Sequence, residues 1–349
     1  MIDLSICIPT YNRTHYLESC LNSIKIANEN SDLSVEVCVS DNNSEEKVIP
    51  IIDKYKDKFN LVFNQNQKNI GLGKNILKSV SLASGEFAWI LGNDDIVLPN
   101  SFSEIHSLIK KNDDVDFYYI NSFHADESII NQHPLDAEKI NSLSLKKFSN
   151  YKKSEKINFF QLIDPRKSFE FMLSMYLCIF RRKYWTQNLN IIDVEKISDP
   201  ELYSNFDNTA PHIKIWSRAF KEKLAFFMNK PLTVNIHGPR NKDWGHLYPF
   251  VESVRIPQVL DCYRKDGLPF FRYIICKNYA LRRFFPSYFN MFKNPKTSGL
   301  KFVNIYNDIV KNLIYPSIYI LGIFFLIRRV LIIIKKFLIK IKKYFFNDK

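Results

Sequence analysis

The stretch LSICIPTYNRTHYLESCLNSIKIANENSDLSVEVCVSD, residues 4–41, decides the fold. It begins and ends with short apolar runs, Leu4–Pro9 and Val35–Ser40, which are typical of buried strands. Between these runs, apolar side chains recur at the spacing of one helix face: Leu17, Leu21 and Ile24. A strand, a helix and a strand in this order predict a right-handed βαβ unit, and therefore a parallel sheet with flanking helices.

The same alternation continues along the chain. Leu61–Asn64 and Phe87–Leu91 are further apolar runs, with a helical spacing of apolar residues between them. The segment SEEKVIPIIDKYKDK, residues 44–58, has acidic residues near its N-terminal end and lysines near its C-terminal end. Because this order complements a helix dipole, we expect a helix that begins at Ser44. Residues 121–168 are polar and weakly periodic, and we expect them to form a long excursion over the ligand side.

Polar residues follow three of the expected strands. Ligands of open parallel sheets bind beyond the carboxyl ends of the strands, so these exits are expected to share one edge. They are PTYN at 9–12, SDN at 40–42 and GNDD at 92–95. Asp41 can accept hydrogen bonds from a nucleobase or ribose, although an Asx-type turn explains the same residue. The pair Asp94 and Asp95 offers the oxygen ligands that Mg²⁺ and Mn²⁺ prefer, although a turn or helix cap is the alternative.

The segment NIGLGKN, residues 69–75, places two glycines between an expected strand and an expected helix. Its spacing is neither the dinucleotide-binding fingerprint nor a Walker motif. A helix that opens here can still present backbone N–H groups and Lys74 to a phosphate.

Charge and composition narrow the class of protein. Hydrophobic residues make up 46% of the 349 residues, which excludes a disordered chain. The formal net charge is +13, but residues 317–349 hold eight basic residues and one acid, which leaves only +6 elsewhere. A body that binds nucleic acid is therefore not expected. Six cysteines without a regular framework, and an N-terminus without a signal-peptide pattern, favour a reduced cytoplasmic setting.

Taken together and in this order, SICIPTYNR, Asp41, NIGLGKN and ASGEFAWILGNDD resemble the family 2 glycosyltransferases of the GT-A fold over residues 2–115. The resemblance implies a nucleotide diphospho-sugar donor, Mn²⁺ or Mg²⁺, and inversion at the anomeric carbon. It implies donor contacts from residues at the strand exits and the glycine segment: Pro9, Thr10, Tyr11, Asn12, Arg13, Asp41, Asn69, Gly71, Lys74, Asn75, Asn93 and Asp94. Asn93 replaces the first acid of the usual motif, so Asp95 is expected to be the direct metal ligand, with Asp94 nearer the sugar or ribose.

The second half is similar to the abequosyltransferase-like branch of that family, which builds O-antigen side chains. The matching pieces are YLCIFRRKYW, APHIKIWSRAF and NKPLTVNIHGPRNKDW. Where the family has an acidic pair whose aspartate deprotonates the acceptor, this chain has Pro211-His212. His212 is a reasonable general base, Asp207 is the alternative, and a helix-capping or pocket histidine explains position 212 equally well. Arg240, in the basic segment HGPRNKDW, can reach a diphosphate.

The C-terminal segment 316–346 has its own pattern. Its longest uncharged run, Pro316–Ile327, is 12 residues long, which is too short to span a bilayer. Pairs of basic residues recur every seven positions on an otherwise apolar helix: Arg328/Arg329, Lys335/Lys336 and Lys342/Lys343. This pattern favours an interfacial helix on anionic lipid over a soluble core helix or coiled coil. It would hold a cytoplasmic enzyme peripherally at the membrane, near a lipid-linked glycan acceptor such as an undecaprenyl-linked oligosaccharide.

We therefore expect a GT-A domain at 1–245, with a nucleotide-binding half at 1–115 and an acceptor half at 116–245. A helical region at 246–315 and the interfacial helix follow. The expected function is sugar transfer to a surface polysaccharide or O-antigen acceptor. The alternative is a non-catalytic membrane-associated assembly protein with a degenerate sugar-nucleotide fold. A nucleotidyltransferase is disfavoured, because the loop after the first strand contains no glycine.

Overall fold

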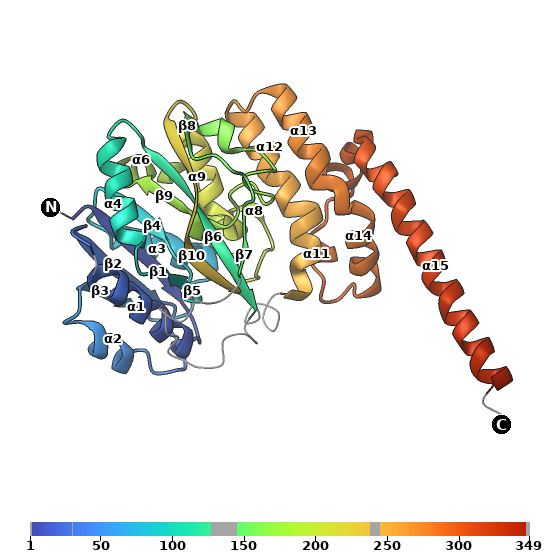
Figure 1. Ribbon diagram of the computed structural model, residues 1–349, viewed down its shortest axis with the longest axis horizontal. Coiled ribbons are helices and arrows are strands. Elements are labelled where there is room, and N and C mark those ends of the chain that lie inside the picture. The colour runs from blue at the N-terminus through green and yellow to red at the C-terminus, as the bar shows by residue number, and fades with distance from the viewer. Residues whose placement is uncertain (1, 30, 127–144, 238–244, 347–349) are drawn as a thin grey trace.

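The computed structural model describes residues 2–29, 31–126, 145–237 and 245–346. Its centre is a ten-stranded sheet with helices on both sides (Figure 1). The order of neighbouring strands is β3-β2-β1-β4-β9-β6-β10-β5, with β7 beside β6 and β8 beside β10. The strands are β1 Leu4–Thr10, β2 Val35–Asp41, β3 Asn60–Gln65, β4 Phe87–Ile90, β5 Asp95–Val97, β6 Phe117–Asp126, β7 Lys146–Lys147, β8 Glu155–Asn158, β9 Cys178–Arg181 and β10 Leu224–His237.

Helices connect these strands and continue beyond them. The α-helices are α1 Thr14–Glu29, α2 Ile49–Tyr55, α3 Leu72–Ser81, α4 Ser101–Lys111, α6 Arg182–Gln187, α7 Val194–Ile197, α8 Phe206–Thr209, α9 Pro211–Phe220, α11 Tyr248–Phe250, α12 Ile256–Asp266, α13 Phe270–Ala280, α14 Phe284–Lys293 and α15 Pro316–Phe346. Short 3₁₀ helices are η2 Phe159–Leu162, η3 Met175–Leu177, η4 Leu189–Ile191, η5 Gly245–Leu247, η7 Leu281–Arg283, η8 Leu300–Phe302 and η10 Val310–Ile314. Two π-helical turns are η6 Val251–Arg255 and η9 Ile305–Ile309.

The first half of the sheet is parallel, as the sequence predicts. β1 pairs in parallel with β2 and β4, and β2 pairs in parallel with β3. All seven residues of β1 are buried, because helices cover both faces of this part of the sheet. Beyond β4 the sheet is mixed: β9 runs antiparallel to both β4 and β6, and β10 runs parallel to β6. The predicted α/β class, a mostly parallel sheet with flanking helices, is confirmed.

The helix expected at Ser44 begins five residues later, at Ile49, so that boundary is wrong. Tertiary hydrogen bonds hold the preceding residues in a loop. The Ser44 hydroxyl donates to Asp41 at 2.5 Å. The Glu46 carboxylate accepts from the backbone N–H and the hydroxyl of Thr14, at 2.7 and 2.6 Å. Glu46 therefore serves the N-terminus of α1 rather than that of its own helix.

The expected excursion at 121–168 is partly wrong as well. Its first residues continue β6 to Asp126, and Glu155–Asn158 forms β8 against the start of β10. Polar side chains hide the strand period here because several of them are buried and bonded: Asn121 and Ser122 are both fully buried. Residues 127–144 lie outside the described part of the chain.

One large apolar core extends from Leu4 to Cys276, so it crosses both positions at which we expect domain boundaries, 115 and 245. A second cluster joins the helices after α9 and includes Phe250, Phe284 and Ile318. The helical region expected after residue 246 is present, and Figure 1 shows α11–α14 standing between the sheet and α15. The boundaries themselves stay predictions.

The C-terminal helix α15 begins at Pro316 and extends away from the rest of the molecule (Figure 1). Its first turns pack on α14, where a Cβ at Gly322 would come within 2.4 Å of the Phe285 ring. Further along, Ile323 and Phe324 are exposed. Within the described residues, no single helix is long and apolar enough to cross a membrane. Ile305–Ile314 and Pro316–Ile332 reach that length and apolarity only together, with a 92° bend between them.

Candidate functional site

A cavity of about 650 Å³ opens where strands β1 and β4 end. Its size is in the range of small-molecule sites, and its position is the one at which open α/β sheets bind ligands. Five of the residues predicted from sequence line it: Pro9, Arg13, Asn93, Asp94 and His212. They come from the exits of β1 and β4 and from α9, which lies more than a hundred residues further along the chain.

Of the adjacent pair Asp94 and Asp95, Asp94 is the acid that faces this cavity. Its carboxylate accepts a hydrogen bond from Arg13 Nη1 at 3.2 Å, and both side chains line the cavity wall. Gly92 allows this arrangement, because a Cβ there would come within 2.8 Å of Asp94 Oδ1 and 2.6 Å of Asp95 Oδ2. The pair therefore presents one carboxylate and one guanidinium side by side to a ligand.

Asp95 is turned into the protein. It is fully buried, and it accepts from the Gly92 N–H at 2.9 Å and from Asn235 Nδ2 at 2.5 Å. These bonds join the exit of β4 to β10, so Asp95 shapes the turn. Asn93 has a similar bracing contact, since its Nδ2 donates to the Thr10 hydroxyl at 2.8 Å. Among the described lining residues, Asp94 and not Asp95 supplies a carboxylate.

Asp41 lies at the end of β2 and is also fully buried. It accepts from the Ser44 N–H and hydroxyl and from Gln65 Nε2, the last at 3.0 Å. This is the Asx-type turn that the sequence allowed as an alternative. A nucleotide contact from Asp41 stays a prediction, because in this structure its oxygens already have protein donors.

The glycine segment at the start of α3 forms a second set of contacts. Asn75 is buried and binds the backbone carbonyl of Ser40 at 2.9 Å, while Asn69 caps the Gly71 N–H at 2.9 Å. Gly71 has φ +85°, a conformation that favours glycine, and a Cβ at Gly73 would come within 3.1 Å of the Asn208 backbone in α8. Both glycines are thus explained by backbone geometry. Lys74 is half-buried and does not line the described cavity wall, so its phosphate role stays a prediction.

Three predicted donor contacts at the exit of β1 lie outside the described cavity wall: Thr10, Tyr11 and Asn12. Tyr11 is 41% exposed. Asn12 adopts φ 49°, and its side chain accepts from the Glu45 N–H at 2.8 Å. Arg240 lies outside the described residues.

His212 is buried at the start of α9 and points one ring nitrogen at the carbonyl of Leu173, at 3.1 Å. Because a carbonyl only accepts hydrogen bonds, Nε2 carries the proton in this arrangement. Nδ1 then holds a lone pair, and it has no hydrogen-bond partner among the described residues. Burial lowers the pKa of His212 to about 4. Its basicity is therefore close to that of an ordinary aspartate, whose pKa is about 3.9.

Asp207, the alternative base, makes different contacts. It accepts from Lys214 Nζ at 2.7 Å and from the Asp193 N–H at 3.2 Å, and it does not line the described cavity wall. Sequence reasoning missed a different acid, Glu170, which does line the cavity. Glu170 belongs to no motif and follows no strand, so only its tertiary position reveals it.

Comparison with known families decides the identity of this arrangement. The model of glycosyl transferase family 2 matches residues 5–184, which is more than half of the chain. The chain belongs to glycosyl transferase family 2. The resemblance expected from the strand exits is confirmed, and the Asp94 turn lies inside the matched segment.

Two curated members of the family show where the similarity is concentrated. The chain is 39% identical over 114 residues to the abequosyltransferase RfbV of Salmonella typhimurium, which covers 32% of this chain and 34% of that protein. It is 35% identical over 109 residues to a Campylobacter jejuni GalNAc(5)-diNAcBac-PP-undecaprenol beta-1,3-glucosyltransferase, which covers 30% and 34%. The chain thus spans about a third of the length of the curated family 2 relatives it matches.

Solved structures extend the likeness of fold. Crystal structures of Staphylococcus aureus TarS with UDP and with UDP-GlcNAc both match with a TM-score of 0.57 at 18% identity. They cover 83% of this chain, and 74% and 75% of the TarS chains. At this identity the comparison shows a shared GT-A fold.

Family 2 enzymes typically use a divalent cation. Within the described residues, no group of three or more His, Cys, Asp or Glu side chains is placed to hold a metal by itself. That does not oppose a metal, since Mg²⁺ commonly binds through one or two carboxylates and completes its shell with substrate phosphates. Asp94, a carboxylate on the wall of a cavity, fits this pattern of binding.

Proposed function

We propose that this family 2 protein transfers a sugar from a nucleotide diphospho-sugar to a hydroxyl of a surface polysaccharide or O-antigen glycan, with inversion at the anomeric carbon. The observation that carries the proposal is the cavity beyond β1 and β4, which brings Arg13, Asp94 and His212 together. The name of the Campylobacter jejuni relative, a glucosyltransferase of an undecaprenol-linked glycan, supports a glycan acceptor.

Asp94 and Arg13 are assigned to the donor diphosphate. Mg²⁺ or Mn²⁺ held by the Asp94 carboxylate would neutralise charge on the departing nucleotide diphosphate. Arg13 can donate to the same phosphate oxygens, because a planar guanidinium suits the geometry of a phosphate group. The metal role given to Asp95 by sequence passes in this proposal to Asp94, since Asp95 already accepts from Gly92 and Asn235.

His212 is assigned to the acceptor. The acceptor oxygen forms a bond to the anomeric carbon, its proton moves to His212 Nδ1, and the electron pair of the broken C–O bond leaves with the nucleotide diphosphate. The Leu173 carbonyl keeps the proton on Nε2 and so keeps the Nδ1 lone pair available. Glu170 is the second candidate for this role, since its carboxylate lies on the same cavity wall.

We place the protein peripherally on the cytoplasmic face of a membrane. Apolar side chains of α15 such as Ile327, Leu331 and Ile334 are exposed, and its basic pairs suit anionic headgroups. A lipid-linked glycan acceptor would meet the enzyme there. Nucleic acid is not a proposed partner, because the excess positive charge is concentrated in this tail.

A panel of UDP-, GDP-, CDP- and dTDP-sugars, each with and without Mn²⁺, tests the proposal. A true donor stabilises the fold by about 2.7 kcal/mol at a hundredfold excess over its Kd, and it releases a nucleotide diphosphate during turnover. We expect Asp94→Asn to lower kcat by about 100-fold or more, because charge on the leaving group is no longer compensated.

Asp53→Asn is the matched control, because Asp53 is an exposed acid in α2 that pairs only with Lys56 among the described residues. It should leave kcat unchanged. Full turnover in Asp94→Asn would disprove the assigned role of Asp94. Binding of no donor, with or without metal, would favour the non-catalytic alternative.

A further inference from the structure

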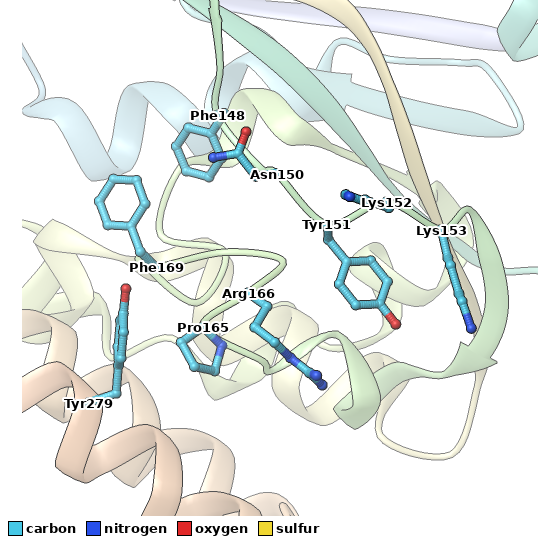
Figure 2. Close-up of a pocket in the computed structure, with 9 residues that line it drawn as sticks. All are labelled: Phe148, Asn150, Tyr151, Lys152, Lys153, Pro165, Arg166, Phe169 and Tyr279. Atoms are coloured by element: carbon cyan, nitrogen blue, oxygen red, sulfur yellow. The ribbon is translucent and has the colours of Figure 1, made fainter.

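A second pocket, with a volume of about 690 Å³, lies beside the candidate site (Figure 2). Phe148 and Phe169 line both cavities, and their rings stack with centroids 5.0 Å apart. Figure 2 shows these rings on one side of the second pocket. On the other side it shows three cationic side chains: Lys152, Lys153 and Arg166. We call this feature the cationic pocket.

Hydrogen bonds hold the backbone segments that carry these cations in position. Fully buried Asn121 donates to the Ser149 carbonyl at 2.8 Å and accepts from the Ser149 N–H at 2.9 Å. Asn229 Nδ2 donates to the Lys152 carbonyl, and the Ser149 hydroxyl donates to the Arg166 carbonyl at 3.0 Å. Both segments that line the pocket are therefore held in place without a ligand.

The cations of this pocket have capacity left for an anion. Lys152 and Lys153 are exposed, and their ammonium groups form no ion pair with any residue that the structure describes. The Arg166 side chain is 73% exposed, and its guanidinium is oriented by buried Asp164, which accepts from Nε at 3.0 Å and from Nη2 at 2.6 Å. Because Asp164 binds Nε and Nη2, the Nη1 group of Arg166 does not take part in this contact. Two free ammonium groups and one guanidinium edge are the donors that suit a phosphate or diphosphate.

A third, apolar groove of about 1110 Å³ continues from the cationic pocket and shares Pro165 and Arg166 with it. Its outer wall is α13, where Phe271 is 82% exposed and Ile275 is 64% exposed. The same helix holds the start of α15, since the Ser317 hydroxyl donates to the Asn278 carbonyl at 2.6 Å. The candidate cavity, the cationic pocket and the groove along α13 thus follow one another, and α13 in turn contacts the start of the proposed membrane helix.

We propose that the cationic pocket binds the phosphate groups of a lipid-linked acceptor, whose sugar enters the candidate site and whose hydrocarbon chain lies along α13. The inference rests on the proposed function for the acceptor's sugar. The order of the three cavities matches the order of glycan, phosphate and lipid in such a molecule. A glycan without phosphate would leave the lysines unused, and a free phosphate would leave the groove unused.

Binding of farnesyl diphosphate to the full chain, measured by calorimetry at low salt, tests the pocket without requiring sugar transfer. We expect Lys152→Ala with Lys153→Ala to weaken binding about tenfold or more, because charged hydrogen bonds to the diphosphate are lost. Lys146→Ala with Lys147→Ala is the matched control: this exposed lysine pair in β7 lines neither the cationic pocket nor the groove. An equal loss of affinity for farnesyl diphosphate in the two double variants would overturn the proposal.

Two further arms identify the occupant. Phe271→Ala with Ile275→Ala should weaken the binding of farnesyl diphosphate and leave the binding of inorganic diphosphate unchanged. Phe292→Ala, at a 62% exposed residue on α14, should change the binding of neither ligand. Farnesol that binds as tightly as its diphosphate, or inorganic diphosphate that binds as tightly as the lipid, would overturn the proposal.

Arg13→Ala separates this inference from the proposed function. The variant should still bind farnesyl diphosphate, because Arg13 lines the candidate site and not the cationic pocket. Loss of farnesyl diphosphate binding in Arg13→Ala would show that the probe occupies the donor cavity and would refute the cationic pocket. Failure of sugar transfer with intact probe binding would instead count against the proposed function alone.

Discussion

At the scale of single residues, His212 illustrates how burial sets chemistry. Its ring is 2% exposed, lies 4.9 Å from the Trp216 ring and bonds one backbone carbonyl. Burial disfavours the imidazolium form and lowers the pKa to about 4, so the ring is neutral near pH 7. A neutral ring with one free lone pair is the form that a general base requires.

The same burial makes stability depend on pH. Between pH 6.5 and 4 the unfolded chain binds a proton at His212 that the native state does not bind, so stability falls as the pH falls through this window. Between pH 7 and 4.5, the free energy of unfolding should fall by about 2 kcal/mol less in His212→Gln than in the wild type, as measured by urea unfolding. The variant should also lower kcat by about 100-fold at pH 7 with little change in KM. Parallel stability curves would refute the buried neutral state, and unchanged kcat would refute the base.

At the scale of elements, the amino ends of β1, β2 and β4 are joined by one buried acid. Glu36 accepts from the Ser5 hydroxyl at 2.5 Å, and from the N–H groups of Ser84 and Gly85 at 2.5 and 3.1 Å. Burial alone would raise the pKa of this carboxyl, but these hydrogen bonds outweigh it and lower the pKa. The carboxylate therefore stabilises the sheet above the unfolded pKa, near 4.5, and this stabilisation is lost as the pH falls through the lower native value.

Glu36→Gln tests this connection, because the NH2 group of the Gln amide is a donor and would face groups that also donate. We expect a loss of about 1.5–3 kcal/mol in the free energy of unfolding. Turnover at a permissive temperature should be unchanged, since Glu36 lies at the opposite end of the strands from the cavity. Glu29→Gln, at an exposed acid that pairs with Lys25 at 3.3 Å, should cost much less. Equal thermal shifts in the two variants would contradict the buried hydrogen-bond set.

At the scale of the whole molecule, α15 has a docked part and an extended part. The docked part includes buried Ile318, and the rings of Phe325 and Phe289 lie 5.8 Å apart. The extended part of α15 beyond Val330 carries five lysines and no acid. Each basic residue near an anionic lipid surface contributes about 1 kcal/mol, so this part should dominate membrane attachment.

Truncation after Val330 is expected to leave the fold intact and to lower affinity for phosphatidylglycerol-containing vesicles by more than about 100-fold, as measured by co-sedimentation. The full chain should bind pure phosphatidylcholine vesicles more weakly, and added salt should weaken binding to the anionic vesicles. Truncated protein that sediments with anionic vesicles as well as the full chain would exclude α15 as the attachment.

The sequence by itself determined the parallel half of the sheet, the family and the long C-terminal helix. These follow from local patterns: apolar runs with polar exits between Leu4 and Asp95, and an uninterrupted apolar and basic repeat after Pro316. It placed the start of α2 too early, because Glu46 caps α1 through a contact between distant segments. It also treated the first residues after 120 as a loop, because buried Asn121 and Ser122 hide the strand period.

Only the tertiary structure decided which acids can meet a ligand. Asp94 and Asp95 are adjacent in sequence, yet one faces the cavity with Arg13 and the other is turned toward Asn235. Glu170 reaches the same cavity as His212, although its segment carries no motif. The physical reason is that the hydrogen-bonding capacity of a side chain and its spacing along the chain are properties of the local sequence. The burial of that side chain, its partners and its orientation depend on which distant segments pack together.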